Sequence, residues 1–226
     1  MLGMGHSAET WICICSCLGK VSGRAWKDYD GNLLKACIAR LSNLETTDDE
    51  VSEILSLVVR RLEFGIADWN NTSLANIAGH IRDESHAPST VFGSLMPIAC
   101  KIVSGQKGEY LAATRLAKSP LLSAVGMRVG QYYENFPDLP VSTVLDWVGG
   151  WSNVAGRLCL TEGCREGVLA SGLVPKLVDA WAEGNRRLKE QGIGTQPPPW
   201  KGTTHEKILD ELTEIARQGK AKFYFL

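Results

Sequence analysis

The chain has no excess of charge of either sign, because its 226 residues carry a formal net charge of −1. A protein that binds nucleic acid usually shows a basic patch or a surplus of lysine and arginine, and this sequence lacks that electrostatic signature. No apolar run reaches the length of about 18 residues that a membrane-spanning helix needs. The composition therefore predicts no nucleic-acid partner and no membrane span.

Alternation of apolar and polar residues, the mark of a strand, is also nearly absent, and only Trp11–Cys17 sustains it for any length. Apolar residues recur at helical spacing instead, and the hydrophobic fraction of 44% is enough for a sizeable core. Thr47 with Glu50, and Thr203 with Glu206, have the spacing of capping boxes, which start helices. We therefore predict an all-α protein with very little strand.

The cysteines lack the pattern of a disulfide framework, since there are seven of them at irregular spacings. Cys37, Cys100 and Cys159 lie within apolar helical patterns, where cysteine packs as a small hydrophobic side chain. Unpaired thiols in this number indicate a reducing compartment, so we expect the protein in the cytoplasm or the nucleus.

One group of cysteines is close together in the sequence: Cys13, Cys15 and Cys17. Alternating thiols on an extended segment could share a soft metal ion such as zinc or copper(I). A closed zinc site needs a fourth ligand, however, and His6 is the nearest candidate. The alternatives are a buried helix with packed thiols, or exposed thiols that are acylated. We expect packing, and therefore neither a metal nor a cofactor.

A four-residue word recurs along the chain. Leu-Ser-Asn-Leu at 41–44 returns as Leu-Ala-Asn-Ile at 74–77 and as Trp-Ser-Asn-Val at 151–154, with a degenerate copy, Thr-Arg-Leu-Ala, at 114–117. Taken in chain order, Asn43, Asn76, Arg115 in the place of the asparagine, and Asn153 are 33, 39 and 38 residues apart. A near-constant step of this size is typical of stacked helical units, each of which cannot bury its apolar face alone.

A second sequence pattern follows two copies of this word at a similar distance. Gly93–Pro97 and Gly172–Pro175 each place a glycine before apolar residues and a proline. Glycine can adopt positive φ and end a helix, and proline is tolerated in the first turn of the next helix. Both segments are therefore predicted to be boundaries between helices.

The segments 151–155 and 164–178 together resemble an armadillo repeat. That family ends one helix with a Leu-Ser-Asn-Leu-Ala word, continues through a short helix ending in Ala-Gly, and starts the next helix with a proline. Residues 73–103 are similar, and residues 33–64 and 109–148 are similar to a smaller degree. The resemblance covers most of the chain between residues 33 and 178.

This resemblance implies an all-α fold in which armadillo/HEAT-like helical repeats form a right-handed superhelix. We expect a single domain of this kind over residues 1–226. Its predicted parts are helical units at about 30–65, 66–104, 105–140 and 141–190, a proline-rich insertion at 192–202 and a C-terminal helix at 204–219.

The resemblance also implies a function, that of a non-enzymatic module or scaffold that binds a protein or peptide segment along the concave groove of the repeats. The predicted groove residues are Asn76 and Asn153, whose amides can both donate and accept hydrogen bonds, Arg115 as the charge at the equivalent place, and Trp147 or Trp151 as an aromatic anchor. For each asparagine the alternative is an internal hydrogen bond that holds its own repeat together. The oligomeric state stays open.

The competing class is an α-helical enzyme or metal-binding protein that uses a thiol or the cluster Cys13–Cys17. A closed pocket with a perturbed thiol would favour the enzyme, whereas a continuous concave strip on the surface would favour the module. The segment Pro197–Trp200 also allows two interpretations. It is either an exposed ligand for an aromatic-lined groove or an insertion whose Trp200 folds back onto the core, and we expect the second.

Overall fold

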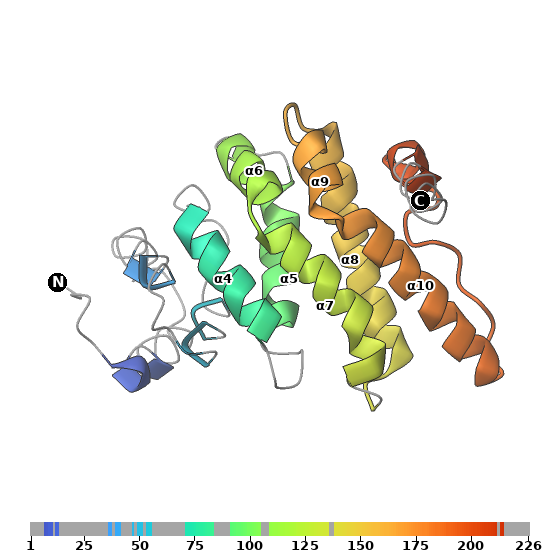
Figure 1. Cartoon of the computed structure of the whole chain (residues 1–226), viewed down its shortest axis with the longest axis horizontal. Helices are drawn as coiled ribbons and strands as arrows, with labels where there is room; N and C mark the ends of the chain where they lie inside the picture. Colours follow the sequence, from blue (N-terminus) through green and yellow to red (C-terminus); the bar gives the residue numbers. More distant parts are fainter. Residues whose placement is uncertain are drawn as a thin grey trace, which may run out of the picture. The chain divides into compact units, whose positions relative to one another are not determined.

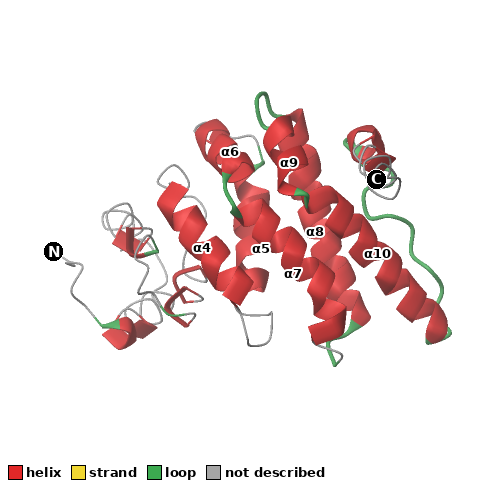
Figure 2. Ribbon diagram, viewed as in Figure 1, coloured by secondary structure: helices red, strands yellow, loops and turns green. Residues whose placement is uncertain are grey.

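In the computed structural model, residues 7–10, 12–13, 36–37, 39–41, 47, 49–51, 53–55, 71–83, 91–104, 109–135, 138–211 and 213–214 are described (Figure 1). Within these ranges all regular structure is helical, which confirms the predicted all-α class (Figure 2). None of the described helices combines the length and the apolarity needed to cross a membrane. The complete helices are α4 (Asn71–Asp83), α5 (Val91–Ile102), α6 (Glu109–Lys118), α7 (Leu121–Asn135), α8 (Val141–Leu160), α9 (Arg165–Ser171) and α10 (Leu173–Glu190).

Contacts along the chain divide it into two compact units, Met1–Leu121 and Leu122–Leu226. The predicted boundaries near residues 104, 140 and 190 all fall between helices, because α5 ends at Ile102, α8 begins at Val141 and α10 ends at Glu190. A single repeat domain over the whole chain stays a prediction.

In the first unit, α4, α5 and α6 contact one another. The predicted capping box at Thr47 is present: the backbone N–H of Glu50 donates to the Thr47 hydroxyl, and the N–H of Thr47 donates to the Glu50 carboxylate. Glu50 is fully buried and also accepts a hydrogen bond of 2.9 Å from Nε of Arg40. One carboxylate therefore caps a helix start and neutralises an arginine at the same time.

The predicted helix boundary at Gly93–Pro97 is wrong, because Pro97 lies inside α5. A proline there has no N–H to give to the carbonyl four residues earlier, which normally destabilises a helix. The helix continues nevertheless, since Leu95 and Ile98 on either side of Pro97 are buried in the core. Burial of this apolar face outweighs the lost hydrogen bond.

The second predicted boundary, at Gly172–Pro175, is confirmed. Gly172 ends α9 with φ of 68° in the left-handed region, which a residue with a Cβ rarely adopts. Helix α10 begins at Leu173, so Pro175 lies in its first turn, where its missing N–H removes no helical bond.

Helix α8 is the centre of the second unit and packs against both α9 and α10 (Figure 1). Helix α7 approaches α10 closely at a glycine: a Cβ on Gly126 would lie 3.1 Å from Cα of Leu173. Another glycine, Gly184 of α10, leaves room for the side chains of Tyr133 and Leu145. Small residues therefore set the distances between these helices.

After α10 the chain runs without regular structure to Trp200, which is 4% exposed. The predicted folding back of Trp200 onto the core is therefore confirmed. The next helix begins at Glu206, but the capping box predicted with Thr203 does not form. The Thr203 hydroxyl instead donates to the carbonyl of Trp200, and the Glu206 carboxylate accepts from the N–H of Gly202.

Candidate partner-binding surface

One face of α8 carries polar residues that are accessible to solvent. Asp146, Gly150, Asn153 and Arg157 follow at intervals of three or four residues, so they lie along one side of the helix. Asp146 and Arg157 are exposed, and Gly150 and Asn153 are half-buried. We call these four residues the α8 face.

Within the α8 face, Nε of Arg157 donates a hydrogen bond of 3.2 Å to Oδ1 of Asn153. This bond orients the amide, so that Nδ2 of Asn153 stays available as a donor; in the described part of the chain no acceptor binds it. No carboxylate within the described ranges pairs with Arg157, and no cation pairs with Asp146. The α8 face therefore presents the Nδ2 hydrogen-bond donor of Asn153 together with the negative charge of Asp146 and the positive charge of Arg157.

The predicted aromatic anchors lie on the other sides of α8. Trp151 has no exposed surface, and Trp147 is 7% exposed with its ring centroid 5.1 Å from that of Tyr132. Both indoles are part of the core of the second unit, so neither is displayed to a partner in this structure. Their spacing of four residues, in phase with buried Val144 and Val148, was the sequence signal for this burial.

Asn76, the predicted groove residue of α4, is 8% exposed. Its Nδ2 donates a hydrogen bond of 2.7 Å to the carbonyl oxygen of Leu41, 35 residues away in the sequence. This contact joins the predicted helical units 30–65 and 66–104 within the first unit, so it is a structural bond between two repeats and not the bond within a single repeat that the alternative describes.

Replacing Asn76 with alanine is expected to lower the free energy of unfolding by about 1–2 kcal/mol, because the buried carbonyl of Leu41 loses its donor. Urea denaturation followed by circular dichroism measures this change. An unchanged stability would show that the bond to Leu41 contributes nothing to the first unit.

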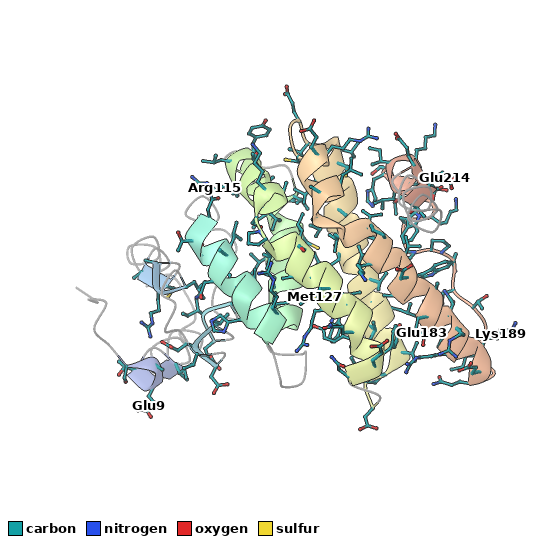
Figure 3. All side chains as sticks on the ribbon, viewed as in Figure 1. Glu9, Arg115, Met127, Glu183, Lys189 and Glu214 are labelled. Carbon is teal, nitrogen blue, oxygen red and sulfur yellow. The ribbon has the colours of Figure 1, made fainter. Side chains whose placement is uncertain are left out.

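Arg115 lies in the last turn of α6 and is half-buried (Figure 3). One turn before it, Leu111 is 53% exposed, and Tyr110 beside it is 57% exposed. Arg115 and Asn76 belong to the first unit and Asn153 to the second, so the predicted alignment of the three in one groove stays a prediction.

The thiols of the second unit are packing groups. Burial raises the pKa of Cys159 to about 11, so its thiol is protonated at neutral pH and is a poor nucleophile. Cys164 is fully buried. Cys13 is exposed, whereas Cys15 and Cys17 lie outside the described residues, so the prediction that they hold no metal stays untested by the structure.

A cavity of about 570 Å³ lies between the start of α8 and the end of α10. Its charged groups are largely paired: Arg186 contacts Glu183 and Glu190, and Arg187 contacts Glu183. Hydrogen bonds, first from Arg186 and then from Arg187, lower the pKa of Glu183 to about 2. The cavity lining includes neither cysteine nor histidine, so it does not provide the pocket with a thiol that would favour an enzyme. The lining residues are Asp138, Leu139, Pro140, Val141, Ser142, Arg186, Arg187, Leu188, Glu190, Gln191 and Ile193.

His205 covers a further part of α8, where its ring lies against Gly156. The side chain is 5% exposed, and its Nδ1 has no hydrogen-bond partner among the described residues. Burial lowers the pKa of His205, and the positive charge of Arg157 lowers it further. Both effects favour the neutral form of this imidazole in the folded protein.

We expect the stability of the second unit to fall on mild acidification. Because the pKa of His205 is lower in the folded state than in the unfolded chain, the unfolded chain binds the proton more readily. Neutral His205 makes its full contribution to the free energy of unfolding above about pH 6.5, the ordinary pKa of histidine. That contribution is lost as the pH falls from about 6.5 through the pKa that His205 has in the folded state. Denaturation curves of the unaltered chain and of His205→Gln should differ in slope over this range, and identical pH profiles would contradict the assignment.

Comparison with known proteins finds no relative: no protein-family model, no curated protein and no solved structure matches the chain. The armadillo-like resemblance therefore stays a prediction.

Proposed function

We propose that the chain is a non-enzymatic interaction module, built as a right-handed superhelix of armadillo-like repeats, that binds a protein or peptide segment across the α8 face. The observation that carries the proposal is Asn153, a half-buried residue whose amide is held through Oδ1 by Arg157, so that its Nδ2 is left as a hydrogen-bond donor. An oriented amide loses little conformational freedom on binding, so its hydrogen bond to a partner is more favourable.

The dimensions of the α8 face match an extended segment. Asp146 and Arg157 are 11 residues apart in α8, which is about 16 Å along a helix axis. Extended chain covers this distance with about five residues. The best ligand is therefore an extended segment with a basic side chain at one end, for Asp146, and an acidic side chain at the other, for Arg157.

The two asparagines of the recurring word take different roles in this account. Asn76 holds the first unit together through Leu41, whereas Asn153 is half-buried and carries the partner contact. Arg115 contributes a charge at the corresponding place on α6. Trp147 and Trp151 support the face from the core and do not act as anchors.

The reducing compartment proposed for the module, cytoplasm or nucleus, is supported by the sequence, whose seven cysteines lie at irregular spacings unlike those of a disulfide framework. No described contact favours the enzyme alternative, because the buried Cys159 thiol is protonated at neutral pH.

Affinity capture tests the proposal. The unaltered chain and a doubly charge-reversed variant, Asp146→Lys with Arg157→Glu, are each used to capture proteins from a cell extract, followed by quantitative mass spectrometry. Both side chains are exposed, so the variant should fold normally, as circular dichroism can verify. We expect at least one protein that is captured by the unaltered chain and depleted about tenfold with the variant. Equal capture by both would remove the α8 face as the binding surface.

A further inference from the structure

The segment Ile193–Trp200, which we call the strap, folds back along α10 after the turn that ends this helix. At its start, the backbone N–H of Ile193 donates a hydrogen bond of 2.8 Å to the carbonyl of Leu188. Further along, the N–H of Gln196 donates a bond of 2.6 Å to Oδ1 of Asn185. The strap therefore runs antiparallel to α10 and is held by its main chain.

Asn185, which accepts the hydrogen bond from the strap, has a side-chain amide whose orientation is already fixed. Asn185 is 8% exposed, and its Nδ2 donates to the carbonyl oxygen of Trp181 at 3.3 Å. This bond fixes which amide atom faces the strap, so Oδ1 is directed at a backbone N–H. Trp181 lies four residues earlier on the same side of α10, so an indole and an oriented amide act together.

The far end of the strap is anchored by an aromatic side chain. The ring centroid of Trp200 lies 6.1 Å from that of Trp181, and its Nε1 donates to Oδ1 of Asp210 at 2.9 Å. Helix α8 contributes at Gly149, where an added Cβ would lie 3.5 Å from the side chain of Pro199. The strap thus contacts α10 along its length and α8 at Pro199.

The body of the strap is weakly held compared with its anchors. Residues 193–197 are exposed, and the three prolines Pro197, Pro198 and Pro199 have no N–H to donate. Consecutive prolines favour an extended polyproline conformation even in a free chain, so little ordering accompanies binding. Gly192, which precedes the strap, has φ of 74° in the left-handed region, where glycine allows the chain to turn back after α10.

We propose that the surface formed by Trp181, Asn185 and Gly149 is a recognition site for an extended proline-rich segment that ends in tryptophan. In the single chain this site is occupied by the chain's own strap. The occupant in trans is the strap of a second copy, because it has the same sequence as the bound segment. The site does not involve the amide or the charges of the α8 face, so it stands independently of the function proposed above.

A labelled peptide with the sequence of residues 193–204 tests this site on the full chain. Gln196→Pro removes the N–H that Asn185 accepts, at an exposed position where proline fits an extended segment, and it should weaken the internal strap without unfolding the protein. Fluorescence polarisation should show the peptide binding this variant about tenfold more tightly than the unaltered chain, because the internal competitor is weakened. The matched control is the same variant with Asn185→Ala, which should lose the gain.

A second variant, Trp200→Ala, offers a rescue measurement. The peptide supplies the missing indole and should raise the melting temperature of Trp200→Ala, whereas a peptide with alanine in place of its tryptophan should not. If folded Gln196→Pro binds the peptide no more tightly than the unaltered chain, or if both peptides shift the melting temperature of Trp200→Ala equally, the site is not a recognition site.

Discussion

Replacing Trp200 with alanine is expected to lower the free energy of unfolding of the second unit by about 3–5 kcal/mol, the usual range for removing a buried indole. Trp200 is 4% exposed and packs against Trp181, and it lines one packing space together with Ser152 of α8, Leu177 of α10 and Leu209 of the final helix. The substitution leaves a cavity where these elements meet. Urea denaturation followed by circular dichroism gives the change.

A conservative variant separates the two contributions of this indole. Trp200→Phe keeps an aromatic ring against Trp181 but loses the hydrogen bond from Nε1 to Asp210. Its cost should be nearer 1 kcal/mol, the net value of one hydrogen bond, plus the smaller ring volume. Equal losses for the alanine and phenylalanine variants would show that the hydrogen bond, and not packing, anchors the final helix.

Replacing Gly156 with alanine should destabilise the second unit by about 3 kcal/mol, at the upper end of the effects of overpacking. A Cβ at this position would lie 2.3, 2.4 and 2.8 Å from the Cδ2, Cγ and Cβ atoms of His205. Such contacts do not occur in folded proteins, so the segment that carries His205 must move away from α8. Thermal denaturation of the variant measures the loss.

A glycine-to-alanine substitution should stabilise the protein where the added Cβ has room. Gly79 lies inside α4, and an added Cβ there would meet nothing within 4 Å, so Gly79→Ala should stabilise by about 0.5–1 kcal/mol through helix propensity. The second control is Gly156→Ala combined with His205→Ala, which removes the ring and should be less damaging than Gly156→Ala alone. Destabilisation that persists unchanged in the double variant would place the clash elsewhere.

Helix boundaries could be predicted from the sequence only where local signals decide them. The pattern at Gly172–Pro175 gave a true boundary, because Gly172 adopts positive φ. The similar pattern at Gly93–Pro97 did not, since α5 runs through it. The two segments look alike locally, and burial of Leu95 and Ile98 by the rest of the first unit makes the difference. Tertiary packing of this kind is not encoded in a short window of sequence.

The candidate site was predicted in part. The recurring word located Asn153 at an accessible place on α8, but it also selected Asn76, which is buried against Leu41. Whether an asparagine bonds internally depends on a carbonyl 35 residues away, which a pattern cannot show. Asn185 was missed, although Trp181 four residues before it was a readable signal on the same helix.

The proposed binding surface depends most on Asn153, and one paired measurement on Asn153→Ala tests it: the dissociation constant for a partner captured by the chain, and the melting temperature of the same sample. If the α8 face binds the partner, affinity should fall by about 1–3 kcal/mol, as expected for a lost hydrogen bond that leaves a buried group unpaired, while the melting temperature changes little. A clear drop in melting temperature with unchanged affinity would contradict the account. In that case Asn153 would have the internal role that Asn76 has in the first unit.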